Sequence, residues 1–365
     1  MKMTIDGIEV PCRTGMTILE AAESAGIPIP TLCHMRGLLP IGGCRICVVE
    51  VEGSTRLIGA CHTPVTKGMA VKTRSPRVQK VRKTIVELML AGHTGPCVSD
   101  ERIGQCELNS LASDLEAGPP RFRARKERCY PVEDQSPYIT RDLTRCIRCG
   151  RCVKACSEIV GQDVYGAGYR GFGTKIIVDC DVALAKDVCR DCGVCAEYCP
   201  TSALTIPGMR PQKKRAREAI AEARPAPARE RHDGLLPILR DRQQASGYLS
   251  DDFLMETAKS LQMPLSEVYG VASFYAFLSR KPQGRNFIRV CGSIPCYLKG
   301  SQRIIETIRK EIGIGPGETS PDKRFSLELT NCIGACDAAP AALVNDDVHG
   351  GLTPEKIAGV LKGYR

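Results

Sequence analysis

Eight cysteines between positions 146 and 199 form two copies of the spacing C-x2-C-x2-C-x3-C, and Pro200 follows the second copy. Thiolates at this spacing can hold [4Fe-4S] clusters, and where two copies occur the fourth cysteine of each copy ligates the cluster of the other. The pattern therefore predicts two adjacent clusters that can carry single electrons. The predicted ligands are Cys146, Cys149, Cys152 and Cys199 for one cluster, and Cys189, Cys192, Cys195 and Cys156 for the other.

Zinc or a disulfide framework is the alternative use of these cysteines. Zinc sites usually pair two C-x2-C units, whereas three cysteines in succession and the Cys199-Pro200 step are typical of iron-sulfur proteins. Ser157 stands where proline would usually follow the first copy, but it does not remove the ligand Cys156. No secretory signal is visible at the N-terminus, and 21 cysteines in such a chain argue for metal.

Four cysteines nearer the N-terminus form the spacing C-x10-C-x2-C-x13-C. Alternating apolar residues around Asp6-Gly7 predict a β-hairpin, and Thr17 with Glu20 predicts a capping box at the start of a helix. A strand is expected at 48–51. Two strands, a helix and a cysteine-containing loop are the order of a β-grasp ferredoxin. Four thiolates suit a [2Fe-2S] cluster, which we expect on Cys33, Cys44, Cys47 and Cys61.

A last group of cysteines near the C-terminus has the spacing C-x4-C-x35-C-x3-C. Helices are expected at 251–261 and 264–269, and then a strand at 286–290, a helix at 302–312 and a strand at 325–329. This order is βαβ-like, but the group lacks the C-x2-C of a thioredoxin-type dithiol. We expect a second [2Fe-2S] cluster on Cys291, Cys296, Cys332 and Cys336.

Two parts of the chain resemble known families. Residues 33–34 (Cys-His) and 43–47 (Gly-Cys-Arg-Ile-Cys) resemble the N-terminal domain shared by iron-only hydrogenases and the large iron-sulfur subunit of respiratory complex I. The C-terminal cysteine spacing, with residues 270–275 and 332–336, resembles the thioredoxin-like [2Fe-2S] subunit of complex I and of NAD-linked hydrogenases. Together the resemblances imply a fusion of two subunit types that usually occur apart.

The first resemblance also implies a [4Fe-4S] cluster on one His and three Cys, spaced H-x3-C-x2-C-x5-C, after an apolar helix at 81–90. This chain has His93, Cys97 and Cys106, but Asp100 replaces the middle cysteine. A carboxylate is a harder donor than a thiolate. Three alternatives therefore stay open: a complete cluster, a cluster with one iron fewer, and a helical scaffold without metal.

Composition limits the other possibilities. The length of 365 residues suggests two or three domains, and the absence of Trp predicts small cores. Much of the net charge of +10 lies at residues 210–232, where we predict a solvated linker rather than a nucleic-acid-binding arm; a basic surface also suits acidic redox partners. No stretch approaches the roughly 20 apolar residues of a membrane span, and we expect a cytoplasmic protein.

Some Cys and His residues are not needed as ligands. Cys12, Cys129 and Cys180 are expected to be packed side chains. His34 and His62 are expected to be exposed or hydrogen-bonded neighbours of the ligands beside them.

The expected fold is an α+β multidomain architecture. Its parts are a β-grasp [2Fe-2S] domain at 1–80, a small helical His/Cys domain at 81–125, a ferredoxin domain with two [4Fe-4S] clusters at 136–209, a basic linker at 210–234, and a thioredoxin-like [2Fe-2S] domain with N-terminal helices at 235–365.

The sequence shows no G-x-G-x-x-G between a strand and a helix, and the glycine-containing run at 168–173 is better interpreted as a turn. We therefore expect neither flavin nor nucleotide in this chain and no catalytic site of its own. The resemblance implies an electron-transfer subunit of an NAD(P)-linked or electron-bifurcating complex. Its expected partners are a flavin-containing NAD(P)-binding subunit and a hydrogenase, formate dehydrogenase or ferredoxin-linked module. The alternatives are a stand-alone polyferredoxin and a zinc-stabilised nucleic-acid-binding protein.

Overall fold

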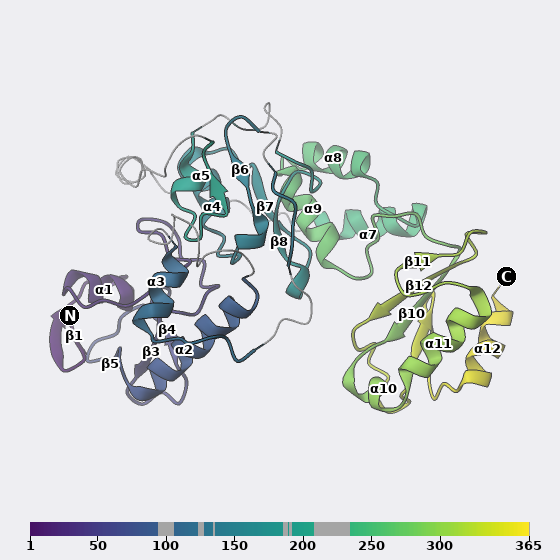
Figure 1. The fold of residues 1–365 in the computed structure, drawn as a ribbon, viewed down its shortest axis with the longest axis horizontal. Helices are drawn as coiled ribbons and strands as arrows, with labels where there is room; N and C mark the ends of the chain where they lie inside the picture. The colour runs from purple at the N-terminus through teal and green to yellow at the C-terminus, as the bar shows by residue number, and fades with distance from the viewer. Residues whose placement is uncertain are drawn as a thin grey trace. The chain divides into compact units, whose positions relative to one another are not determined.

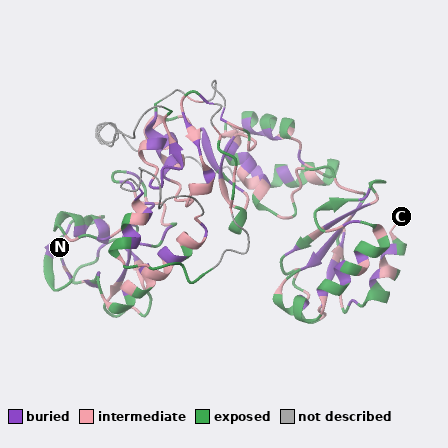
Figure 2. Cartoon of the chain, in the orientation of Figure 1, coloured by how far each residue is buried: buried purple, intermediate pink, exposed green. Residues whose placement is uncertain are grey.

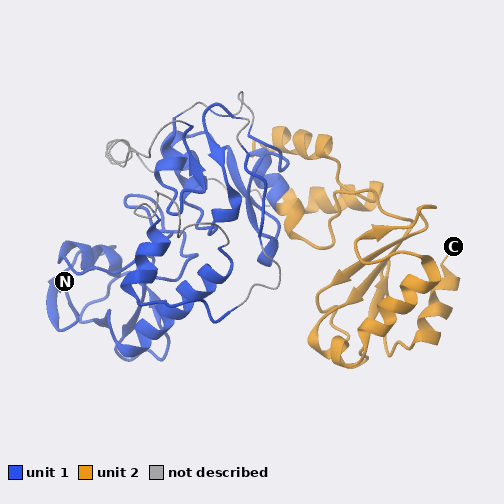
Figure 3. Ribbon diagram, viewed as in Figure 1, with its two compact units in different colours: residues 1–231, 264–270 blue, residues 232–263, 271–365 orange. Residues whose placement is uncertain are grey.

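The computed structural model describes residues 1–93, 106–122, 128–133, 136–184, 189, 192–207 and 234–364 (Figure 1). The chain divides into two compact units, one of Met1–Arg231 with Pro264–Gly270 and the other of His232–Met263 with Val271–Arg365 (Figure 3). The predicted linker lies outside the described residues except for Gly234, as do Cys97 and Asp100.

A five-stranded sheet of order β2-β1-β5-β3-β4 forms the N-terminal part. Its strands are β1 (Lys2–Ile5), β2 (Ile8–Pro11), β3 (Val48–Val51), β4 (Ile58–Gly59) and β5 (Ala70–Lys72). The predicted hairpin is confirmed, because β1 pairs antiparallel with β2 through a turn in which Asp6 and Gly7 have φ of 50° and 85°. Such φ values suit Gly and Asp, which tolerate the left-handed region.

Helix α1 (Ile18–Ser24) packs against this sheet through Ile18, Leu19, Ala21 and Ala22. The predicted capping box is confirmed: the Glu20 N–H donates to Thr17 Oγ1 at 3.2 Å, and the Thr17 N–H donates to Glu20 Oε2 at 2.7 Å. These bonds satisfy backbone donors at the helix start, and this fixes where α1 begins.

Two helices follow the sheet, α2 (Pro76–Ala91) and α3 (Glu107–Asp114). Helix α2 begins five residues before the expected start at 81, because Ser75 caps it and Pro76 occupies its first position. Its buried residues include Val78, Arg82 and Val86, spaced four apart on one face.

The double-cysteine region is built from short elements around a small core. They are β6 (Thr140–Arg141), η2 (Leu143–Arg145), α4 (Arg151–Lys154), the π-helix η3 (Ala155–Val160), β7 (Tyr165–Gly168), η4 (Gly171–Gly173), β8 (Lys175–Val178), α5 (Val194–Glu197) and β9 (Leu204–Thr205). Strand β6 pairs with β9 and β7 with β8, both antiparallel. The run at 168–173 is the end of β7 and a 3-10 turn, in agreement with the sequence interpretation.

The two cysteine copies share a local conformation. Gly150 and Gly193 have φ of 77° and 69°. Each glycine follows a cysteine of the motif and is the N-cap of a short helix, α4 or α5. A side chain is rarely found at such φ values. The repeated glycine therefore lets both copies fold back on themselves in the same way.

The C-terminal sheet has the order β11-β12-β10-β13-β14. Three helices precede it, α7 (Leu235–Ser246), α8 (Asp251–Ser260) and α9 (Leu265–Phe274). The remaining elements are β10 (Asn286–Cys291), α10 (Ile294–Leu298), α11 (Ser301–Ile312), β11 (Glu318–Thr319), β12 (Phe325–Thr330), β13 (Ala342–Val344), β14 (Asp347–His349) and α12 (Pro354–Gly363).

Strands β10 and β12 are parallel, and β13 and β14 are antiparallel, with α11 as the crossover between β10 and β12. Helices α11 and α12 supply Ile304, Ile308 and Ile357 to the core that the strands share (Figure 2). The elements expected at 286–290, 302–312 and 325–329 are thus confirmed to within one residue at each end. The molecule has a mixed α/β architecture, and none of its described helices is both long and apolar enough to cross a membrane.

Candidate metal centres

The four N-terminal candidate ligands are all buried, beside the sheet of β1 to β5. They form two thiol pairs, Cys33 with Cys44 and Cys47 with Cys61. A hydrogen bond from the Cys33 thiol lowers the pKa of Cys44 to about 5, and a hydrogen bond from Cys61 lowers the pKa of Cys47 to about 7. Donating these bonds raises the pKa of Cys33 and of Cys61. Two adjacent thiol pairs fit the four thiolates that a [2Fe-2S] cluster needs.

A cavity in the double-cysteine region is lined by Cys146, Cys149, Cys152 and Cys199, together with Leu143, Ile147, Gly150, Ile176, Pro200, Thr201, Ala203 and Leu204. These four cysteines are the set predicted for the first [4Fe-4S] cluster, and Cys199 comes from the other copy of the motif. Backbone N–H groups of Arg148 and Ala203 donate to the sulfurs of Cys146 and Cys199 at 3.3 and 3.2 Å. An apolar cavity ringed by thiols suits a cluster whose charge the thiolates and backbone dipoles compensate.

The second predicted set is also gathered, although residues 185–188 and 190–191 lie outside the described part. Cys156 and Cys195 are buried, and the charges of Cys192 and Cys189 raise the pKa of both after burial itself. The charge of Cys195 also raises the pKa of Cys152, so the two predicted sets of ligands lie next to each other. The Tyr165 hydroxyl lies 3.6 Å from Cys195 Sγ.

Burial dominates the titration of these thiols. It raises the pKa of Cys146 and Cys156 to about 11 and that of Cys149 and Cys195 to about 12. A thiolate in such surroundings is costly unless a positive charge compensates it. Metal ions that bind here must displace the thiol protons.

The C-terminal candidates lie at or after the ends of the parallel strands β10 and β12. Cys291 ends β10 and Cys296 lies in α10, both buried, whereas Cys332 and Cys336 follow β12 and are exposed. The sulfurs of Cys332 and Cys336 are 3.2 Å apart. The hydrogen bond to Cys332 raises the pKa of Cys336, and the charges of Cys332, Cys296 and Cys291 raise it further. The four thiols are therefore neighbours.

His93 lies just after α2, and Cys106 is buried at the N-cap of α3. Burial lowers the pKa of His93, and Arg145 lowers it further, so the ring is neutral near pH 7 and able to ligate a metal. Cys97 and Asp100 lie outside the described residues. Whether this site holds metal stays a prediction.

Three candidate sites meet in one apolar cluster. It contains Cys33, Cys44, Cys106 and, partly buried, Cys149. The buried Arg151 donates to Glu107 Oε1 at 2.9 Å, and the Glu107 N–H donates to Pro200 O at 2.7 Å. Glu107 directly follows Cys106, and Pro200 directly follows Cys199, so these bonds join the candidate ligands of different sites.

The cysteines and histidines that are not expected to be ligands differ in burial and contacts. Cys12 is buried and donates to Val10 O at 3.3 Å, as expected of a packed side chain. Cys129 is exposed, so its expected packing is wrong, and Cys180 is half-buried. His62 Nδ1 lies 3.5 Å from Cys61 Sγ, which confirms that His62 is a hydrogen-bonding neighbour of a candidate ligand. His34 is half-buried and its buried Nδ1 has no hydrogen-bond partner among the described residues, so its expected exposure or hydrogen bonding is not confirmed, and burial lowers its pKa.

Among the described residues, no three His, Cys, Asp or Glu side chains converge on a single ion position. A [4Fe-4S] cluster does not require such convergence, because its four thiolates bind different irons. Sequence reasoning missed the arginines next to these sites, Arg82 and Arg151. The signal was present in α2, where Arg82 interrupts an apolar stripe.

Fold and cysteine arrangement together define the class as an iron-sulfur protein of ferredoxin-type and thioredoxin-like domains. Residues 1–76 match a 2Fe-2S iron-sulfur cluster binding domain, and residues 136–205 match the ferredoxin-like domain of NADH-quinone oxidoreductase subunit 3. Residues 217–365 match the thioredoxin-like [2Fe-2S] ferredoxin family.

Similar proteins match slightly more than half of this chain. NADP-reducing hydrogenase subunit HndD of Solidesulfovibrio fructosivorans is 39% identical over 56% of this chain, and NADPH-Fe(3+) oxidoreductase subunit alpha of Geobacter sulfurreducens is 38% identical over 56%. The chain spans only 36% and 24% of the lengths of these two relatives. A chain of an NAD+-reducing [NiFe]-hydrogenase in the H2-reduced state is 32% identical, with a TM-score of 0.50 over 57% of this chain and 87% of its own.

The chain therefore belongs, through its N-terminal half, to the family of iron-sulfur subunits found in complex I and in NAD(P)-linked hydrogenases. Its C-terminal part is a thioredoxin-like [2Fe-2S] ferredoxin domain. The fusion that the sequence predicted is confirmed.

Proposed function

We propose that this protein is the electron-transfer subunit of an NAD(P)-linked oxidoreductase complex. It relays single electrons between a flavin-containing NAD(P)-binding subunit and a second redox module of the hydrogenase, formate dehydrogenase or ferredoxin-linked type. The observation that carries the proposal is the apolar cluster that contains Cys33, Cys44, Cys106 and Cys149, because it brings candidate ligands of separate sites into one packed core.

The names of the relatives support the link to NAD(P). The two proteins named above are an NADP-reducing hydrogenase subunit and an NADPH-Fe(3+) oxidoreductase subunit. A third is the mitochondrial NADH-ubiquinone oxidoreductase 78 kDa subunit of Neurospora crassa, which is 33% identical over 56% of this chain. A flavin is needed between NAD(P)H and the clusters, because a hydride carries two electrons and each cluster accepts one.

The proposed cofactors are two [2Fe-2S] and two [4Fe-4S] clusters on the 16 cysteines identified from the sequence. When bound, they accept and release single electrons. The paired N-terminal thiols support the [2Fe-2S] cluster on Cys33, Cys44, Cys47 and Cys61. The four-thiol cavity supports the [4Fe-4S] cluster on Cys146, Cys149, Cys152 and Cys199. The domain division expected from the sequence stays a proposal, and it differs from the two compact units in one segment, because Pro264–Gly270 packs within the N-terminal unit. There the Tyr269 hydroxyl lies 3.2 Å from that of Tyr169.

A docking surface for the flavin-containing subunit is proposed on α10. Ile294, Tyr297 and Leu298 are 74%, 57% and 77% exposed, and they surround the buried candidate ligand Cys296 in the sequence. Exposed apolar side chains grouped in this way are typical of protein interaction sites. A partner seated there would lie close to the C-terminal cluster.

Metal content tests the proposal directly. Anaerobically purified protein is expected to contain about 12 irons per chain and matching acid-labile sulfide, from two clusters of two irons and two of four, and an occupied His93 site adds roughly three or four irons to this number. Elemental analysis and the visible sulfur-to-iron charge-transfer absorbance measure both. Stoichiometric zinc with little iron would support the nucleic-acid-binding alternative instead.

The His93 site is proposed to hold an additional cluster, since His93 is neutral and Cys106 is buried beside other candidate ligands. We expect His93→Ala to lower the iron content by roughly three or four per chain. Asp100→Cys is expected to change one electron paramagnetic resonance (EPR) signal and leave the other signals alone. Unchanged iron content and spectra in both variants would mean that the site is a scaffold without metal.

The stand-alone polyferredoxin is the second candidate. It predicts rapid electron exchange with soluble carriers but no stable complex with a flavoprotein. Purification of the native protein with its bound subunits distinguishes the two candidate functions. Fractionation of the same cells checks the cytoplasmic location predicted from the sequence.

A further inference from the structure

Arg82 is a buried charge at a position where the pattern of α2 calls for an apolar residue. Val78 and Val86, one turn before and after it on the same face, are fully buried, and Arg82 itself is only 2% exposed. A buried guanidinium is costly unless hydrogen bonds and an opposite charge compensate it. Its surroundings therefore indicate what it is there to do.

The guanidinium reaches from α2 to the N-terminal candidate centre. Its Nε donates to Ile46 O at 3.1 Å and its Nη2 donates to Val48 O at 2.8 Å. These two carbonyls lie on either side of Cys47, one of the four candidate ligands. Arg82 thus holds the backbone that presents the Cys47 thiol.

No carboxylate in the described part of the chain forms an ion pair with Arg82. The most favourable charge acting on it is that of Cys47, with a smaller effect from Asp6. Asp6 already accepts hydrogen bonds from the N–H and the hydroxyl of Thr73. Burial lowers the pKa of Arg82 to about 10, so the side chain stays positive at neutral pH.

We infer that Arg82 is the built-in counterion of the N-terminal [2Fe-2S] cluster and raises its reduction potential. The inference rests on the proposed assignment of that cluster to Cys33, Cys44, Cys47 and Cys61. A [2Fe-2S] core with four thiolates carries a net negative charge, and one-electron reduction adds a further negative charge while no bond forms or breaks. A positive charge held nearby in a low-dielectric interior stabilises the reduced form more than the oxidised form.

The charge and the hydrogen bonds of Arg82 can be separated by substitution. Arg82→Gln removes the charge and keeps an amide donor, whereas Arg82→Lys keeps the charge but cannot reproduce the two-nitrogen fork. A purely structural role predicts similar behaviour of the two variants. A role as counterion predicts that only the glutamine variant changes the potential.

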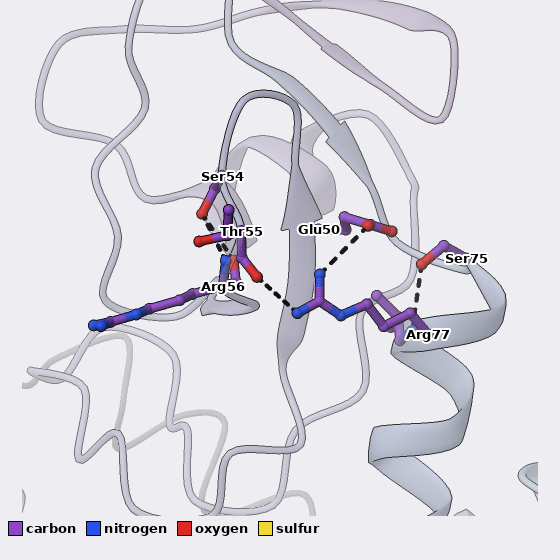
Figure 4. Close-up of polar contacts among 7 residues, drawn as sticks. Glu50, Ser54, Thr55, Arg56, Ser75 and Arg77 are labelled. Atoms are coloured by element: carbon purple, nitrogen blue, oxygen red, sulfur yellow. Dashed lines mark hydrogen bonds and ion pairs between the residues drawn. The ribbon is translucent and has the colours of Figure 1, made fainter.

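Arg77 provides a matched control on the same helix (Figure 4). Its Nη2 donates to Thr55 O at 2.7 Å, so it also ties α2 to the neighbouring sheet. Unlike Arg82, its side chain is 51% exposed and has a carboxylate near it, with Nη1 3.9 Å from Glu50 Oε1. Arg77→Gln should therefore leave the potential of the cluster unchanged.

The test is a redox titration of the full chain under anaerobic conditions, followed by EPR, with dithionite as the reductant. The N-terminal signal is identified as the one lost in Cys61→Ala. In Arg82→Gln its midpoint potential is expected to shift to a more negative value, with iron content retained. Arg82→Lys and Arg77→Gln should titrate like the unaltered protein, and the signals of the other clusters should not move.

Other outcomes would overturn the inference. They are an unshifted potential in a fully loaded Arg82→Gln, and an equal negative shift in Arg82→Lys. If the Arg82→Gln variant does not load the cluster, the Arg82→Lys variant distinguishes the two roles. Normal loading and an unshifted potential in Arg82→Lys support the counterion role, whereas failure of Arg82→Lys to load the cluster leaves only a structural role. Absence of the N-terminal signal in the unaltered protein would instead refute the proposed cluster assignment.

Discussion

Cys199→Ala is expected to remove one [4Fe-4S] cluster, a loss of about four irons per chain, and that cluster should be the one held by the first cysteine copy. The reason is that Cys199 lines the cavity that contains Cys146, Cys149 and Cys152, although it belongs to the second copy in sequence. A cube that loses one of its four thiolates has an open iron in a partly apolar site and is expected to be lost during purification.

Double variants distinguish crossed from uncrossed ligation without any need to identify the cluster that is lost. Cys146→Ala combined with Cys199→Ala should lose about four irons, the same as either single variant, because both residues serve one cube. Cys195→Ala combined with Cys199→Ala should lose about eight. The reverse pattern, with eight irons lost in the first pair and four in the second, would show that each copy holds its own cluster. The Cys12→Ala variant, at a buried cysteine that belongs to the core of the N-terminal sheet and not to that of the double-cysteine region, controls for nonspecific loss of the [4Fe-4S] clusters.

Neither NADH nor NADPH is expected to reduce the isolated chain, although dithionite should reduce it. Electrons from a hydride must first divide at a flavin, and the sequence shows no nucleotide-binding fingerprint. A co-expressed flavin-containing NAD(P)-binding subunit should make the clusters reducible by one of the two nucleotides. Stopped-flow absorbance of the clusters follows this reaction with and without that subunit.

The α10 surface gives this prediction a matched pair of variants. Leu298→Asp should weaken subunit binding by about 10-fold or more, if Leu298 lies in the centre of the interface, while iron content stays the same. Val348→Asp on β14, an edge strand of the C-terminal sheet on which Val348 is 57% exposed, should have little effect. Rapid reduction of the purified chain alone by either nucleotide would contradict the proposed roles of the two subunits. Equal binding of the flavin-containing subunit to the two variants would show that the docking surface is not on α10.

Local features of the fold followed directly from the sequence. The Asp6-Gly7 turn and the Thr17-Glu20 capping box each depend on residues within four positions of one another, so their physics is contained in a short segment. The same holds for the strands and crossover helix of the C-terminal sheet, whose apolar patterns are distinct. The start of α2 was misplaced because Ser75 and Pro76 precede the apolar run that signals the helix.

Cysteine spacing by itself determined the kind of chemistry in this protein, because a cluster needs several thiolates at fixed intervals and little else produces such a pattern. The tertiary structure decided what surrounds that chemistry. It brought Cys199 to the cavity of the other copy, joined Glu107 to Arg151 and Pro200, and set Arg82 beside Cys47. Sequence patterns could not reveal these contacts, since each joins residues that are 34 to 93 positions apart. Burial and charge depend on which side chains the folded chain brings together, whatever their order along it.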